Sequence, residues 1–175
     1  MNYIYGFIYI FAAWKWGDWR NWRLYYPTIL FFVNGDLLYH FLLFDHFPLW
    51  RFNPVSIDEK NGITSVHISL IIMMIKYPCT ILIYLGNFPK GKLSKQFLYI
   101  TFWVMIYATN EIITHLLGGI KHYNGWNEWW SISFDVVMFS VLALHHYKPV
   151  ISWILSFIYI IVLWNLFDVP STVFR

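Results

Sequence analysis

The most constraining feature of this sequence is an apolar stretch, residues 96–119, that is long enough to cross a bilayer but contains Asn110, Glu111 and His115. About 20 apolar residues at a rise of 1.5 Å each span the ~30 Å hydrocarbon layer. An ionised group near the bilayer centre costs about 2.5–3.5 kcal/mol, whereas each Leu, Ile or Phe returns only about 0.3–0.6 kcal/mol. The stretch can therefore form a transmembrane helix if its acid faces protein or water, which predicts a polar site within the membrane.

The composition supports an integral membrane protein. Hydrophobic residues make up 59% of the chain and charged residues 12%, whereas soluble proteins carry about 25% charged residues. Aromatic residues make up 23%, including 11 Trp, so we expect bulky aromatic packing rather than small-residue seams. The net charge of +3 is spread over the loops and argues against nucleic acid as a partner. The lone Cys79 excludes an intramolecular disulfide.

We predict an all-α, polytopic transmembrane helical bundle that forms a single domain over residues 1–175. Its six spans are expected at about residues 3–16, 27–44, 65–86, 96–119, 131–144 and 151–167. The first stretch is short for a span, so an interfacial anchor that leaves five spans is the alternative. Pro78, in the middle of the third span, should kink the helix or loosen its backbone bonding.

The basic residues of the loops predict the orientation of the bundle. If the first segment spans with its N-terminus outside, one side receives more Lys and Arg than the other. The larger group is Lys15, Arg20, Arg23, Lys90, Lys92, Lys95 and Lys148, and the smaller group is Arg51, Lys60, Lys121 and Arg175. The positive-inside rule then puts the larger group in the cytoplasm and both termini outside, in a bacterial plasma membrane.

Polar side chains of several spans should lie at a similar depth, in the central to outer half of the bilayer, when each residue is allowed a rise of 1.5 Å. These residues are Asn34, Asp36, His40, Lys76, Asn110, Glu111, His115 and Asp135. Intramembrane ionisable residues usually face the bundle interior or a water-filled cavity. The pattern predicts an outward-facing polar chamber.

Two of these helices carry an acid and a histidine four residues apart, Asp36 with His40 and Glu111 with His115. Residues at i and i+4 share one helical face, so the four side chains could bind a divalent metal, relay protons or hold a cation. The alternative is that the pairs only fix helix packing, with Lys76 neutralising an acid. No residue is assigned a catalytic role.

The loop before the fifth span is rich in indoles. Trp126, Trp129 and Trp130 could anchor the chain at the interface or form a lid over the chamber. Asn127 is a candidate N-cap for the fifth helix, and Asp135 could instead act as an acid in its first turn. His145 and His146 are expected to form a solvated turn at the inner surface.

Several of these motifs together resemble an uncharacterised family of small polytopic membrane proteins from spore-forming Gram-positive bacteria. The matching features are the intramembrane Asp36 and Glu111, the run Lys76-Tyr-Pro-Cys-Thr-Ile-Leu-Ile-Tyr84, Phe88-Pro-Lys90, and the Trp-rich start of the fifth span, Tyr123-Asn-Gly-Trp-Asn-Glu-Trp-Trp-Ser131. The resemblance covers residues 14–149, and the sixth span is additional to shorter members. It implies a topology and polar positions but carries no activity.

The sequence lacks the motifs of nucleotide-binding loops, zinc peptidases and serine hydrolases. Three functions remain consistent with the polar layer. The first is binding or transport of a small ligand, cation or lipid headgroup in the chamber. The second is a metal-dependent enzyme that acts on a lipid at the outer leaflet. The third is a structural subunit that binds a membrane partner or a second copy of itself.

Overall fold

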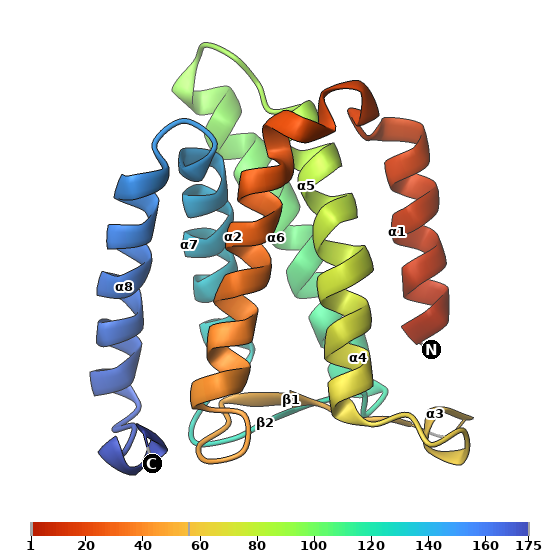
Figure 1. Ribbon diagram of the computed structural model, residues 1–175, viewed down its shortest axis with the longest axis vertical. Coiled ribbons are helices and arrows are strands. Elements are labelled where there is room, and N and C mark those ends of the chain that lie inside the picture. The colour runs from red at the N-terminus through yellow and green to blue at the C-terminus, as the bar shows by residue number, and fades with distance from the viewer. Residues whose placement is uncertain (1, 56, 175) are drawn as a thin grey trace.

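The long helices of the computed structural model lie side by side, and a two-stranded sheet crosses one end of the bundle (Figure 1). The structure describes residues 2–55 and 57–174, and it describes side chains for these except residues 2–4, 57 and 59. Arg175, one of the four basic residues expected on the outer side, lies outside the described residues.

The helices and strands are connected in simple up-and-down order. They are α1 (Asn2–Trp16), η1 (Trp19–Asn21), α2 (Trp22–Leu42), β1 (Trp50–Phe52), α3 (Ile57–Lys60), α4 (Ser65–Ile71), η2 (Ile72–Lys76), α5 (Tyr77–Gly86), α6 (Leu93–Leu116), β2 (Ile120–His122), α7 (Glu128–His145), α8 (Pro149–Leu166) and η3 (Ser171–Phe174). The connections at residues 17–21, 87–92 and 146–148 share one end, and α3 and both strands lie at the other, as Figure 1 shows.

The all-helical prediction is confirmed, and each predicted span coincides with a helix. The bounds shift by a few residues: α2 begins at Trp22 rather than residue 27, and α6 runs over Leu93–Leu116 rather than 96–119. By length and composition, three helical stretches can cross a membrane, Ser65–Gly86, Leu93–Leu116 and Pro149–Leu166. These stretches indicate an integral membrane protein. The sheet was not predicted, because its strands have only three residues each.

The third helical stretch contains a π-helical turn where the sequence predicted a kink. Pro78 has no backbone N–H, and its ring would collide with the carbonyl of Met74 in a regular α-helix. The residues just before it, Ile72–Lys76, form the π-helix η2, in which backbone hydrogen bonds join residues five apart instead of four. The stretch therefore continues without a break, and Lys76, the last residue of η2, borders an interior cavity.

Aromatic side chains fill the centre of the bundle, as the composition predicted. Tyr84 of α5 is fully buried, and its ring packs against Tyr99, Trp103 and Phe139 at centroid distances of 5.6, 5.7 and 5.1 Å. Its hydroxyl donates to the carbonyl of Phe139 at 2.8 Å. This cluster joins α5, α6 and α7, and residues of α2 complete it.

The short helix α1 packs along α5 and η2 through Tyr9 and Ala13, which contact the buried Cys79. The turn after α1 approaches the end of α5 closely: the Asp18 N–H donates to the Leu82 carbonyl at 3.1 Å. A side chain at Gly86 would place its Cβ 2.7 Å from Asp18 Cβ. Glycine is therefore needed where these two segments meet.

The sheet joins the connection between α2 and α4 to the connection between α6 and α7, at the other end of the bundle. Strands β1 and β2 are antiparallel, with Trp50 opposite His122 and Phe52 opposite Ile120. The ring of Tyr39 on α2 stacks on Trp50 at 4.0 Å, and its hydroxyl bonds to the β1 backbone. His122 is thus held over the ends of α6 and α7.

Candidate functional site: a polar cavity and its outer rim

A cavity of about 100 Å³ lies beneath the sheet, and we call it the polar cavity because charged side chains stand among its otherwise largely apolar lining. Its polar lining comes from η2, α5, α6 and α7 and consists of Lys76, Tyr77, Tyr107, Asn110, Glu111, Thr114, Ser131 and Asp135. A volume of about 10–15 Å³, measured in this way, holds one water molecule, so the cavity has room for several waters or a small polar group.

Asp135 is the polar group of the cavity that most needs a partner. The residue is 6% exposed, and its Oδ2 is buried without a hydrogen bond to any described residue. Leaving a buried carboxyl oxygen without a hydrogen bond costs about 1–3 kcal/mol of free energy. A ligand or water that donates to this oxygen would therefore be stabilised.

Lys76 supplies the positive charge of the cavity. Its Nζ lies 4.2 Å from the centroid of the Tyr107 ring and 5.5 Å from that of Tyr9. Asp135, Glu111 and Asp36 all act on it electrostatically, but none of the ion pairs between described residues includes Lys76. These electrostatic contacts are in line with the expectation that Lys76 neutralises an acid, and no described residue accepts a hydrogen bond from its ammonium.

A second, apolar cavity of about 210 Å³ lies between α2, α7 and α8. We call it the groove. Most of its lining is aliphatic or aromatic, with Phe31, Gly35 and Leu42 from α2, Val137 and Val141 from α7, and Trp153, Phe157 and Ile160 from α8. Among the described residues of α8, Ser152 is the one that is buried. The apolar side chains of this helix are therefore also exposed to the surroundings of the bundle.

The two cavities are neighbours with a common wall. Phe32, Trp50, Tyr77, Phe134 and Met138 line both of them. The Phe32 and Tyr77 rings stack at 3.8 Å, and the Tyr77 hydroxyl donates to Asp36 Oδ2 at 3.0 Å. These five side chains are the boundary between the polar cavity and the groove.

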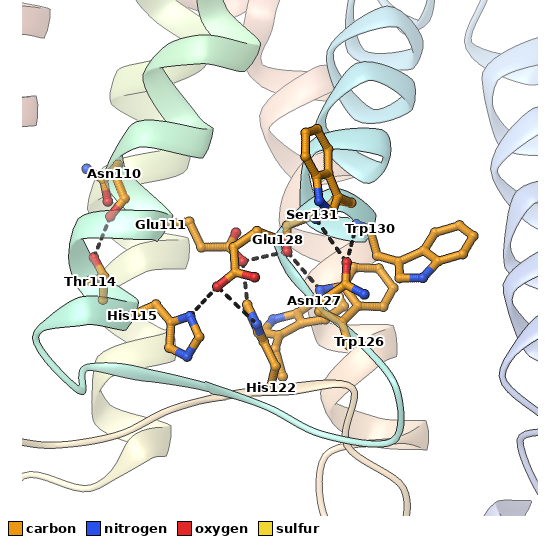
Figure 2. Close-up of polar contacts among 12 residues, drawn as sticks. Asn110, Glu111, Thr114, His115, His122, Trp126, Asn127, Glu128, Trp130 and Ser131 are labelled. Atoms are coloured by element: carbon orange, nitrogen blue, oxygen red, sulfur yellow. Dashed lines mark hydrogen bonds and ion pairs between the residues drawn. The ribbon is translucent and has the colours of Figure 1, made fainter.

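A cluster of acids and histidines lies where α6, β2 and α7 meet (Figure 2). We call the group His115, His122 and Glu128 the outer rim. His115 Nδ1 lies 2.5 Å from Glu128 Oε1, and His122 Nδ1 lies 4.0 Å from the same oxygen. His122 Nε2 lies 2.9 Å from Oε1 of Glu111, which also accepts from the Ser131 hydroxyl at 2.5 Å. A hydrogen bond from its own backbone N–H, and next the contact with His115, hold the pKa of Glu128 below its usual value.

The structure brings four of the eight predicted chamber residues to the polar cavity and places the other four elsewhere. Lys76, Asn110, Glu111 and Asp135 line the polar cavity, and Asp36 lines the groove. His115 belongs to the outer rim instead. His40 and Asn34 line neither cavity, and Asn34 is exposed.

The predicted metal set of Asp36, His40, Glu111 and His115 is not brought together. His40 Nδ1 bonds to the Asp36 carbonyl at 2.9 Å, and its Nε2 bonds to Ser69 Oγ at 2.9 Å, so this pair joins α2 to α4. Glu111 pairs with His122 rather than with His115. The i, i+4 spacing correctly predicted the contact between Asp36 and His40. The partner of Glu111 is instead His122 of strand β2.

The indole-rich loop divides into a buried and an exposed part. Trp126 is buried, lines the polar cavity and donates from Nε1 to Ser131 Oγ at 2.8 Å, which agrees with a lid. Trp129 is 79% exposed, and Trp130 is partly exposed against Phe167. Asn127 is the N-cap of α7, as predicted, because its side chain accepts from the Trp129 and Trp130 N–H groups.

Two other expectations are wrong. Asp135 does not cap α7, because that helix starts at Glu128 and Asp135 lies two turns inside it. His145 is not in a solvated turn: it is buried, its Nδ1 lies 3.0 Å from Thr28 Oγ1, and its ring stacks on Phe31 at 4.2 Å. The α7 helix continues through His145 and carries its ring into the bundle.

Sequence reasoning missed His122 and Glu128 as site residues. Both flank the indole-rich loop, and the aromatic content of that loop drew the interpretation toward a lid. A weak signal was present, because a loop that leaves a helix at His115 and re-enters one at Glu128 must bring its ends close together.

Comparison of the chain with protein-family models, with curated proteins and with solved structures found no match. The site is therefore interpreted from its own geometry.

Proposed function

We propose that this chain is an integral membrane protein that binds an amphiphile from the outer leaflet of a bacterial plasma membrane. The polar headgroup would occupy the cavity bordered by Lys76, Glu111 and Asp135, and the apolar tail would lie in the groove between α2, α7 and α8. The single observation that carries this proposal is the common wall of a polar and an apolar cavity.

The chemistry of the polar cavity favours a headgroup rich in hydrogen-bond donors. Asp135 offers an unpartnered acceptor, and the Glu111 carboxylate borders the same space. Among the described residues that line the cavity with them, Lys76 is the one cation. Hydroxyl or ammonium groups of a headgroup would satisfy the carboxylates, and an anionic group such as a phosphate would bind Lys76.

The proposed topology has six spans with both termini outside. Figure 1 supports a short first span over an in-plane anchor, because α1 runs alongside α5 and η2 rather than across them. The sheet and the polar cavity then lie toward the outer face, and the end with Lys15, Arg20 and Lys90 lies in the cytoplasm. This places the headgroup cavity at the outer leaflet.

Native mass spectrometry tests the proposal. We would release the protein from nanodiscs of defined phospholipids and compare wild type with Glu111→Gln, Asp135→Asn and Gly35→Phe. Gly35 lines the groove, and a Cβ built there meets nothing within 4 Å, so a phenyl ring can enter the groove without a backbone clash. The expected result is one retained lipid in wild type and its loss in Gly35→Phe.

The matched control is Gly6→Phe, because Gly6 on α1 also has open space around it but lines neither cavity. It should retain the lipid. The carboxylate variants separate the two ends of the ligand: they should change which headgroup is retained, whereas Gly35→Phe should remove every lipid. Identical lipid patterns in wild type and Gly35→Phe would refute the proposal.

The same experiment weighs the structural alternative, in which the polar layer only fixes helix packing. Bare protein in wild type and in all variants, with unchanged oligomeric mass, would favour a structural subunit. A shift to a larger mass that depends on none of these residues would favour a homo-oligomer or a membrane partner.

A further inference from the structure

The outer rim contains a group of side chains whose donor atoms converge on one point. His115, His122 and Glu128 each offer one ligand atom, and these atoms lie within 4.8 Å of one another. They come from α6, β2 and α7, so three elements must fold together to form the group. Among the residues whose side chains the structure describes, it is the one such cluster of three or more.

The hydrogen bonding of His122 leaves one ring nitrogen free to bind a metal. Because Glu111 Oε1 accepts at 2.9 Å, the proton of the neutral imidazole lies on Nε2. The lone pair of Nδ1 then faces Glu128, at 4.0 Å from its Oε1. Histidines that bind metals usually donate their other N–H to a carboxylate in this way, which fixes the tautomer and the ring orientation.

The carboxylate that orients His122 is itself held in place. Glu111 Oε1 accepts from Ser131, whose hydroxyl accepts from the indole N–H of Trp126 at 2.8 Å (Figure 2). Trp126 and Ser131 are buried, and the His122 side chain is 7% exposed. The chain of bonds runs from a buried indole to the free nitrogen of His122, so that nitrogen is positioned before any ion arrives.

The other two ligands lie on the solvent side. The side chains of His115 and Glu128 are each 40% exposed, and Nδ1 of His115 already faces Oε1 of Glu128. In a tetrahedral zinc site with metal–ligand bonds of about 2.0–2.1 Å, ligand atoms lie about 3.3 Å apart. The three pair distances run from 2.5 Å to at most 4.8 Å, a range that includes that value, so rotations of the exposed side chains would complete the geometry.

We infer that His115, His122 and Glu128 bind a divalent transition-metal ion, with Glu111 as the positioning residue of His122. Two imidazoles and a carboxylate suit Zn²⁺, and three protein ligands leave a fourth position open for water. This site differs from the expected one, because it excludes Asp36 and His40 and uses Glu111 in the outer shell. None of its three ligands lines either cavity, although Glu111, Ser131 and Trp126, which hold His122 in place, line the polar cavity.

The test is titration of the metal-free, full-length protein in nanodiscs with Zn²⁺ by calorimetry and with Co²⁺ by visible absorption. We expect one Zn²⁺ per chain and a Co²⁺ spectrum typical of a low-symmetry nitrogen and oxygen site. His115→Asn, His122→Asn and Glu128→Gln should each weaken binding at least about tenfold. Glu111→Gln should keep the stoichiometry of one and weaken binding by about 10–100-fold, as loss of an outer-shell carboxylate does.

The matched control is His46→Asn, which removes an exposed histidine from the same end of the bundle and should leave the affinity unchanged. Gly35→Phe should also leave it unchanged, which separates this site from the groove. Absence of saturable binding in wild type, or equal affinity in wild type and His122→Asn, would overturn the assignment. If a ligand variant does not fold, the melting temperature of wild type with Zn²⁺ and with chelator decides, because a true site must raise it.

Discussion

The hydroxyl of Tyr39 ties the first strand and the residue before it to α2 through three hydrogen bonds, and Tyr39→Phe removes that hydroxyl alone. That hydroxyl donates to the Trp50 carbonyl at 2.6 Å and accepts from the N–H groups of Trp50 and Leu49 at 2.9 and 3.0 Å. One donor and two acceptor positions are all that a phenol has, and all are used. The ring stack on Trp50, at 4.0 Å and 3°, survives in phenylalanine.

The expected cost follows from those three bonds. Each is worth about 1 kcal/mol net, so the variant should lose about 3 kcal/mol of stability. For a chain of this size that corresponds to a fall in melting temperature of about 6–12 °C. Because β1 pairs with β2, the loss should also loosen His122, which lies opposite Trp50.

The assay combines thermal unfolding with hydrogen exchange of the backbone amides. In Tyr39→Phe the amides of Leu49 and Trp50 should exchange faster, and the Tyr123 amide, which donates to the Leu49 carbonyl at 2.8 Å, should follow. Tyr26→Phe is the matched control, since this tyrosine lies on the same helix and is 49% exposed. The reasoning fails if both variants melt alike and the β1 amides keep their protection.

Three further changes test other parts of the fold. Gly86→Ala should cost about 1–3 kcal/mol in thermal unfolding, because its Cβ would lie 2.7 Å from Asp18 Cβ. Hydrogen bonds from Asn21 and Tyr25 hold the pKa of Asp18 in the folded protein below its usual value. The ionised carboxylate therefore stabilises the fold fully above the pKa that Asp18 has in the unfolded chain, and this stabilisation is lost as the pH falls through the pKa in the folded protein. Asp18→Asn should therefore lower the melting temperature at pH 7, and the difference from wild type should shrink below about pH 4. Asn127→Ala removes the N-cap of α7 and should cost about 1 kcal/mol, with faster exchange of the two capped amides.

Each of these predictions has an outcome that contradicts it. Gly35→Ala is the control for Gly86→Ala, because a Cβ at Gly35 meets nothing within 4 Å; equal stability of the two variants would exclude the clash. A difference between Asp18→Asn and wild type that stays constant from pH 7 to 3 would exclude the carboxylate as its source. Unchanged exchange at the start of α7 in Asn127→Ala would show that water replaces the cap at no cost.

The helices and the polar layer could be predicted from the sequence because both depend on local patterns. Apolar runs fixed the positions of the long helices to within a few residues, and Asn127 was recognisable as a cap from its place before an apolar stretch. Spacing of four residues correctly placed Asp36 and His40 on one face, where Nδ1 lies 3.4 Å from Oδ1. Lys76, Asn110, Glu111 and Asp135 do share one cavity.

The remainder depends on contacts between distant segments, which no local pattern encodes. Glu111 pairs with His122 because β2 is held by β1, a strand about 70 residues earlier in the chain. His145 is buried because Thr28 and Phe31 of α2 meet it across the bundle. The groove exists because α8 packs mainly against α7 and leaves space beside α2.

The weak burial of α8 has a consequence for biogenesis. The central cluster of buried residues runs from Tyr25 to Ala143 and draws on α2, α5, α6 and α7, with no buried member from α8. During synthesis, the earlier helices can thus complete their packing while α8 is still in the translocon. Docking of α8 then adds the last wall of the groove, so the apolar lining from α2 and α7 stays uncovered until that wall closes over it.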